Sequence, residues 1–205
     1  MSDQAVVAVY SFVRNMVGLV TKPYETYRTI VNHGSLWEIL PLSLLVSSYL
    51  IIASLVKTAT FRPYMLTKHF IVLALAVGTM YGLVVGLVWI IGKMVGGKGN
   101  LRGVVLGWAY TLVPTVCWFL ATSLLYMVIP PPRTDRPLGM LFSLLFLFFS
   151  SVLFFWKLVL SYLTLRFSLK IDLFRIVIIS IVTIPVVVLY SVGMYRLGIF
   201  KIPFV

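Results

Sequence analysis

The chain has 205 residues, of which 61% are hydrophobic, and its mean hydropathy is +1.07. Soluble domains contain about 45–50% apolar residues, so this composition excludes a soluble protein and predicts an all-α polytopic membrane protein. The 17 Lys and Arg residues outnumber the 5 Asp and Glu residues and lie mostly between apolar runs, where basic side chains contact anionic lipid head groups. No continuous basic face is long enough to follow a nucleic acid backbone, so we expect no nucleic acid partner.

Residues 1–35 precede the first long apolar run and form the first predicted unit. Apolar side chains from Val6 to Val20 recur at helical spacing, but Arg14 and Asn15 interrupt the run before it is long enough to cross a bilayer. This pattern predicts an N-terminal amphipathic helix over 4–20 that lies at the cytosolic interface, followed by a linker. Asp3 stands where a signal peptide carries positive charge, so we expect this region to be retained.

The remaining unit, residues 36–205, contains apolar runs that are each long enough to span a bilayer of about 30 Å. These runs predict a five-transmembrane-helix bundle with short connections and no soluble module. The predicted spans are 36–56, 70–91, 104–129, 138–165 and 173–195.

The distribution of basic residues predicts the orientation of this integral membrane protein. The connections on the side of the N-terminus hold slightly more Lys and Arg than those on the other side. Cytosolic loops are enriched in these residues, so we expect a cytosolic N-terminus. With five spans, the C-terminus then lies on the opposite side.

A row of glycines marks the second predicted span. Gly78, Gly82 and Gly86 follow one another at intervals of four residues and share one helical face. Glycines at this spacing allow two helices to approach until their backbones touch. We therefore expect another helix to cover this face, either within the chain or in a homo-oligomer.

The loop between the second and third spans, GKMVGGKGNL, contains the spacing G-x-x-x-x-G-K around Gly96, Gly97 and Lys98. A phosphate-binding loop needs Ser or Thr after this lysine and must join a strand to a helix. Gly99 follows Lys98 here, and the flanking segments are predicted membrane helices. We therefore predict a cytosolic turn that binds no nucleotide.

Two residues within the spans are unusual for lipid surroundings. Pro114 removes a backbone hydrogen bond from the third span and should kink it. Lys157 is an ionisable residue well inside the fourth apolar run, and such residues often mark ion pathways. Glu38 lies near the cytosolic end of the first span, and we expect it, or backbone carbonyls and water, to meet Lys157.

No catalytic constellation is evident, and the chain is not expected to be an enzyme. His33 and His69 lie in or beside predicted loops, whereas an intramembrane Ser-His pair needs a histidine at membrane depth. The acidic residues all lie near predicted interfaces, and Cys117 is the single cysteine. We therefore expect no metal and no cofactor.

Three local patterns in order resemble the Yip1 domain family of polytopic membrane proteins. TKPYETYRTI places Pro23 and Glu25 before the first span, and GGKGNLRGVVLGWAYTLVP joins the glycine-lysine turn to a helix that ends at Pro114. FWKLVLSYLTLRFSLKIDLFRIV then places Trp156 in a long fourth span. The resemblance covers roughly residues 21–189.

This resemblance implies a five-helix membrane domain with a cytosolic N-terminus. Eukaryotic members of the family carry a longer cytosolic region with an Asp-Leu-Tyr-Gly-Pro motif and associate with Rab GTPases. That motif is absent here, so the chain is similar to a prokaryotic-type member, and its expected location is the plasma (inner) membrane of a prokaryote. A role in Rab binding does not carry over.

The favoured function is a non-enzymatic scaffold or adaptor that recruits an unknown protein partner or organises the lipid bilayer through its basic loops. The alternative is a small transporter or channel that uses Lys157. Against the alternative, the five spans contain no evident internal repeat, and one lysine makes a poor proton relay.

Overall fold

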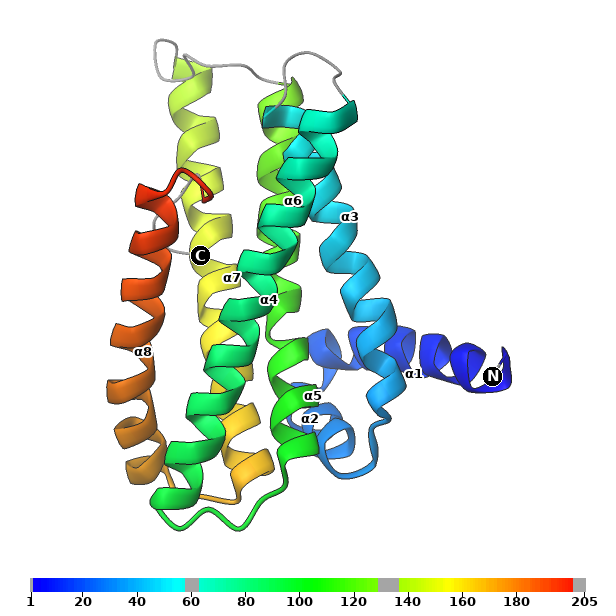
Figure 1. Cartoon of the computed structure of the whole chain (residues 1–205), viewed down its shortest axis with the longest axis vertical. Helices are drawn as coiled ribbons and strands as arrows, with labels where there is room; N and C mark the ends of the chain where they lie inside the picture. Colours follow the sequence, from blue (N-terminus) through cyan, green and yellow to red (C-terminus); the bar gives the residue numbers. More distant parts are fainter. Residues whose placement is uncertain (1, 58–62, 129–136, 201–205) are drawn as a thin grey trace.

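The computed structural model describes residues 2–57, 63–128 and 137–200 of the chain (Figure 1). Within these residues the structure is α-helical and contains no strand, as the composition predicts. The elements are α1 (Ser2–Thr21), α2 (Pro23–His33), the short 3-10 helix η1 (Leu36–Glu38), α3 (Ile39–Lys57), α4 (Pro63–Met94), α5 (Leu101–Tyr110), α6 (Leu112–Val128), α7 (Pro137–Leu169) and α8 (Leu173–Arg196).

The prediction of five membrane spans is confirmed. The segments long and apolar enough to cross a bilayer are Leu36–Leu55, Pro63–Met94, Leu101–Leu125, Gly139–Leu169 and Leu173–Arg196. The second and fourth spans are longer than the sequence analysis predicts, because α4 begins at Pro63 and α7 continues to Leu169. At 1.5 Å per residue, each of these two helices is about 48–50 Å long, well beyond the roughly 30 Å of a hydrocarbon core.

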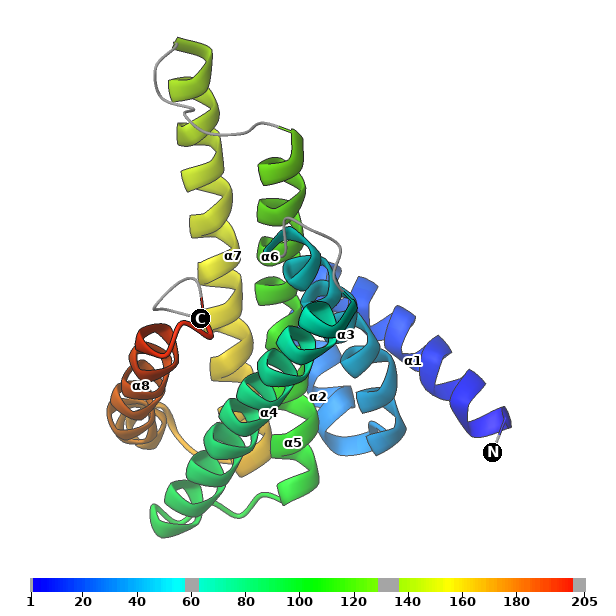
Figure 2. The same cartoon turned by 45° about the horizontal axis from the view of Figure 1, so that its top comes forward.

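The N-terminal region forms two helices packed against one end of the bundle. In Figure 1, α1 runs across the direction of the long helices, and in Figure 2 it also extends outward from them. Its apolar row is exposed, while Ala8, Asn15 and Leu19 on the opposite face are buried. The exposed residues of this row are Val6, Val9, Tyr10, Val13, Val17 and Val20. The structure thus confirms an amphipathic helix, but replaces the predicted linker with the 11-residue helix α2.

The hydrophobic core lies at the end of the bundle that contacts α1 and α2. One cluster joins α1, α2, α3, α5, α6 and α7 around Tyr27, Leu106 and Tyr110. A second cluster joins α4, α5, α7 and α8 around Val88 and Ile179. At the other end, most side chains of α7 between Met140 and Phe155 are exposed and apolar, as expected for a surface that faces lipid.

The third span is divided at Thr111. Helix α5 ends at Tyr110, and α6 begins at Leu112 with Pro114 buried in its first turn. Proline has no N–H and therefore cannot donate to the carbonyl of Tyr110. The interruption of the third span thus lies three residues before Pro114, where the sequence predicts a kink, whereas α8 continues as one helix through Pro185.

Candidate functional site

A buried polar cluster joins α1 to the first and third spans. The carboxylate of Glu38 accepts a hydrogen bond of 2.5 Å from the Tyr110 hydroxyl and one of 2.9 Å from the Asn15 side-chain amide. The same amide lies 3.3 Å from the Tyr110 hydroxyl. All three residues are buried: Glu38 is 2% exposed, Tyr110 0% and Asn15 4%. Because buried polar groups are costly unless they are paired, this cluster specifies how α1 docks.

Glu38 also organises the entry into the first span. Its other oxygen accepts from the backbone N–H of Ser35 at 3.1 Å, and Ser35 completes a capping box with it. The spacing S-x-x-E before an apolar run is a sequence signal for this arrangement that the analysis above missed. The expected pairing of Glu38 with Lys157 is wrong, because Asn15, Tyr110 and Ser35 occupy the carboxylate.

Helix α2 is attached to the third and fourth spans by a buried tyrosine. The Tyr27 hydroxyl donates to the carbonyl oxygen of Gly107 at 3.1 Å, and the side chain is fully buried. Burial raises the pKa of Tyr27 above its usual value, so this hydroxyl stays protonated and keeps its role as a donor. Arg102 adds a second link by donating to the backbone oxygen of Gly34.

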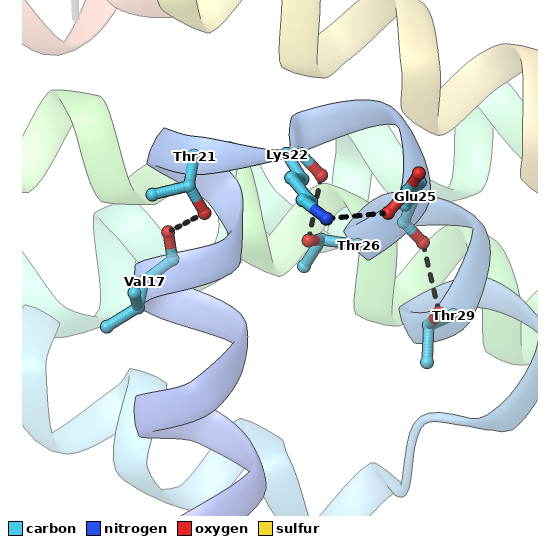
Figure 3. Close-up of polar contacts among 6 residues, drawn as sticks. All are labelled: Val17, Thr21, Lys22, Glu25, Thr26 and Thr29. Carbon is cyan, nitrogen blue, oxygen red and sulfur yellow. Dashed lines mark hydrogen bonds and ion pairs between the residues drawn. The ribbon is translucent and has the colours of Figure 1, made fainter.

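The junction between α1 and α2 is shown in Figure 3. Lys22 is the N-cap of α2, and Pro23 occupies the first helical turn, where its missing N–H has no cost. Lys22 and Glu25 form an exposed ion pair of 3.9 Å, the one ion pair among the residues that the structure describes. Such exposed pairs contribute at most about 1 kcal/mol. Pro23 and Glu25 therefore shape the junction, and their positions do not indicate a binding site.

The predicted cytosolic turn after α4 packs against the end of α7. Gly96 has φ of 86°, a conformation that favours glycine. The N–H of Gly97 donates to the Gly92 oxygen at 2.8 Å, and that of Lys98 donates to the Leu169 oxygen at 3.0 Å. These N–H groups are occupied and the turn joins two helices, so its geometry differs from that of a phosphate-binding loop. This supports the prediction that it binds no nucleotide.

The close-packed glycines are not those that the sequence analysis selected. A Cβ atom on Gly78, Gly82 or Gly86 would meet nothing within 4 Å, so none of the described helices covers this face. The expectation of an intrachain contact there is wrong.

A second row with the same spacing makes close contacts instead. A Cβ on Gly99 would lie 1.5 Å from the Ser168 backbone oxygen, and one on Gly107 would lie 2.8 Å from the Thr164 side chain. Gly103 lies between these glycines and is also buried. Gly99, Gly103 and Gly107 therefore allow the start of the third span to approach α7, and the G-x-x-x-G spacing was a signal that could have identified them.

A cavity of about 1000 Å³ lies between α3, α4, α6, α7 and α8. Lys157 lines it, together with mostly apolar side chains from these helices. Since α7 ends at Leu169, Lys157 is about 18 Å from that end, at 1.5 Å per residue. The neighbouring Trp156 packs against the first core cluster. The two adjacent residues thus face different surroundings, one in the core and one in the cavity.

The end of the bundle next to α2 carries most of the described basic residues. Helices α4 and α7 end there and α5 and α8 begin there (Figure 1). Only Glu25 and Asp172 supply exposed carboxylates at this end among the residues described. The basic residues are Lys22, Arg28, Lys93, Lys98, Arg102, Arg166, Lys170 and Arg175.

These features define a helical integral membrane protein with five spans and an N-terminal pair of helices clamped to one end of its bundle. The Yip1 domain model matches residues 17–195, and the chain therefore belongs to the Yip1 domain family. The match includes α2, all five spans and the final residues of α1. No curated protein and no solved structure gives a match.

Proposed function

We propose that this Yip1-family protein is a non-enzymatic scaffold or adaptor. Its working surface is the N-terminal platform, defined here as α1 and α2. The observation that carries the proposal is the buried contact of Asn15 and Tyr110 with Glu38, which holds α1 in one orientation while its apolar row faces outward. A region used only as a flexible tether would not need a buried polar clamp.

The lengths of the helices support an interfacial position for α1. Helix α3 has 19 residues and is about 28 Å long, close to one hydrocarbon thickness. It begins beside α1, because Glu38 precedes it and bonds Asn15. The level of α1 then corresponds to the membrane surface. The excess length of α4 and α7, together with α2 and α5, projects from the membrane on the same side.

Charge supports a cytosolic position for this projecting end. Its basic residues greatly outnumber its exposed acids, which is typical of cytosolic loops and attracts anionic head groups. We propose that the protein lies in a prokaryotic plasma membrane with its N-terminus cytosolic and its C-terminus on the opposite side. The platform then recruits a cytosolic protein partner or gathers anionic lipid.

Site-specific photocrosslinking in cells tests the scaffold role. A crosslinker at Thr29, on the exposed side of α2, should give a discrete protein adduct, and one at Tyr64, at the opposite end of the bundle, should not. The Thr29 adduct should weaken in Tyr110→Phe, because that change loosens the platform. Adducts that are equally strong at both sites, or unchanged by Tyr110→Phe, would contradict the proposal.

The uncovered face of α4 adds a proposal of self-association. Gly78 and Gly82 are exposed and Gly86 is half-buried, so a second copy of α4 has room to approach along this face. Close approach of two backbones is a main source of helix association in lipid. We propose a homo-oligomer through these glycines.

A second candidate function rests on the cavity. A bundle that served only as an anchor would be expected to have a filled core. The volume of this cavity and the position of Lys157 on its wall instead favour a small transporter or channel. Transport requires access to the cavity from both membrane faces. Flux measured in proteoliposomes, compared between the parent chain and Lys157→Met, tests this candidate.

A further inference from the structure

We propose that the cavity binds one long-chain carboxylate, an amphiphile of the fatty acid class, with its carboxylate at Lys157 and its chain along the apolar walls. This inference goes beyond the scaffold role and does not depend on it. It rests on a cation without a partner, two buried hydroxyls without partners, and the volume beside them.

Lys157 lines the cavity without a protein acceptor. No described carboxylate lies within 4.0 Å of its ammonium. The nearby Ser161 hydroxyl donates to the Lys157 backbone oxygen and does not accept from the ammonium. A charged group in apolar surroundings needs a counter-charge or several hydrogen bonds. An anion in the cavity would supply the counter-charge that the Lys157 side chain lacks among the described residues.

Two hydroxyls on other helices also lack a hydrogen-bond partner. The side-chain oxygens of Thr115 on α6 and Thr183 on α8 are buried and have no hydrogen-bond partner. Thr183 is only 5% exposed, and both threonines line the cavity. Buried polar atoms without partners are rare in folded proteins, and a ligand with acceptor oxygens would satisfy them.

The three groups lie at a similar height in the bundle. The bond from the Lys98 N–H to the Leu169 oxygen places the start of α5 beside the end of α7, and α8 begins four residues after Leu169. Counted from this common end at 1.5 Å per residue, Lys157 lies about 18 Å along α7 and Thr183 about 15 Å along α8. Thr115 lies about 21 Å along the third span. The three groups therefore line the cavity at a similar level, where the polar head group of a ligand would find its donors.

The side chains that line the cavity indicate what the remainder of the ligand is, beyond its head group. Beyond this level, toward the far end of the bundle, the lining is mostly apolar, with side chains such as Ala53, Leu73 and Phe119 beside a few polar ones that include His69 and Thr122. Binding sites for small molecules have volumes of about 300–1000 Å³, so this cavity is at the upper end of the range. Such a wall favours a hydrocarbon chain.

The charge of the site favours a carboxylate over a phosphate monoester. Lys157 neutralises one negative charge, which is the charge of an ionised carboxylate. His69 also lines the cavity, but it lies about 38 Å along α4 from the same end, at 1.5 Å per residue, and is therefore far from the level of Lys157. A phosphate monoester carries about −1.5 to −2 near neutral pH and three strong acceptor oxygens. It is usually met by arginine forks or by several donors, and the described cavity wall contains no arginine.

Binding of radiolabelled palmitate to the protein in nanodiscs of phosphatidylcholine tests the proposal. We expect saturable binding of one palmitate per chain. Lys157→Met should weaken binding by about tenfold or more, since it removes the charge and keeps the length, whereas Lys157→Arg should retain most of the affinity. The control Lys98→Met, in the exposed turn, should bind like the parent chain.

A second variant and a competition experiment test the proposal even if Lys157→Met does not fold. Ser180→Phe adds bulk to the cavity wall and leaves the lysine in place, and it should also abolish binding. Hexadecanol has the chain without the charge and should compete about tenfold less well than palmitate. The proposal is overturned by undiminished binding to Lys157→Met or Ser180→Phe, by equal competition from hexadecanol, by tighter binding of lysophosphatidic acid, or by the absence of saturable palmitate binding.

Discussion

The Tyr110 hydroxyl lies 2.5 Å from the Glu38 carboxylate, although 72 positions separate the two residues in sequence. Tyr110 is the last residue of α5, and Glu38 ends the 3-10 helix before α3. The contact therefore ties the break in the third span to the entry of the first span. Asn15 joins from α1, so one buried carboxylate positions three separate parts of the chain.

Removal of the Tyr110 hydroxyl should destabilise the protein and loosen α1. Hydrogen bonds to charged groups contribute about 1.5–3 kcal/mol, and Tyr110→Phe should lower the free energy of unfolding by that amount. Thermal unfolding in detergent measures the loss, and faster protease cleavage within 2–21 reports the loosened helix. Tyr64→Phe, at an exposed tyrosine in α4, is the matched control and should unfold like the parent chain. Equal unfolding temperatures for the two variants would refute this role.

The two glycine rows should respond oppositely to added methyl groups. Gly99→Ala places a Cβ where the Ser168 backbone oxygen lies, so the turn must move, and we expect a loss of more than about 3 kcal/mol. Gly82→Ala places its Cβ in open space on a helix, where alanine is favoured by about 1 kcal/mol. Unfolding of both purified variants in the same detergent compares them. A Gly99→Ala variant as stable as Gly82→Ala would show that the turn does not depend on this close contact.

The spans and the amphipathic character of α1 could be predicted from the sequence because they rest on hydrophobic runs and local periodicity. Packing between helices could not. In lipid, apolar faces do not distinguish a neighbouring helix from a hydrocarbon chain, so nothing local showed that Gly107 is covered and Gly82 is not. Their spacing is the same, and only the position of α7 separates them.

Glu38 illustrates a second limit. The sequence analysis paired it with Lys157 because opposite charges on one side of a membrane attract. The structure instead gives it Asn15 and Tyr110, neutral donors whose burial depends on how α1 and α5 meet. In the sequence pattern, Asn15 is only an interruption of an apolar run. Its side chain faces the protein, on the side of α1 opposite the exposed Val13. The helical period accounts for this orientation once it is known which face of α1 is packed.

Helix α1 should lie at the membrane surface, with its apolar row in the head-group region. In a Cys117→Ala background, a fluorophore at Val13→Cys should be quenched most strongly by lipid nitroxides close to the head group, because an interfacial helix buries its apolar face only about 5–10 Å. A fluorophore at Thr29→Cys, on exposed α2, should respond to a water-soluble quencher instead. Quenching of the Val13 label by nitroxides at the bilayer centre, or by the aqueous quencher alone, would place α1 elsewhere.

The exposed glycines of α4 make a separate prediction about self-association. Since a Cβ at Gly82 meets no other described part of the chain, Gly82→Leu should not lower the unfolding temperature of the monomer. In a homo-oligomer the same leucine would hold two copies of α4 apart, because close backbone approach requires small residues. We therefore expect Gly82→Leu to convert an oligomer to a monomer in multi-angle light scattering. Leu75→Ala, a change at another exposed position of α4, should preserve the oligomer. An oligomer that persists in Gly82→Leu would exclude this face as the interface, and a drop in monomer stability would mean that the face is covered within the chain after all.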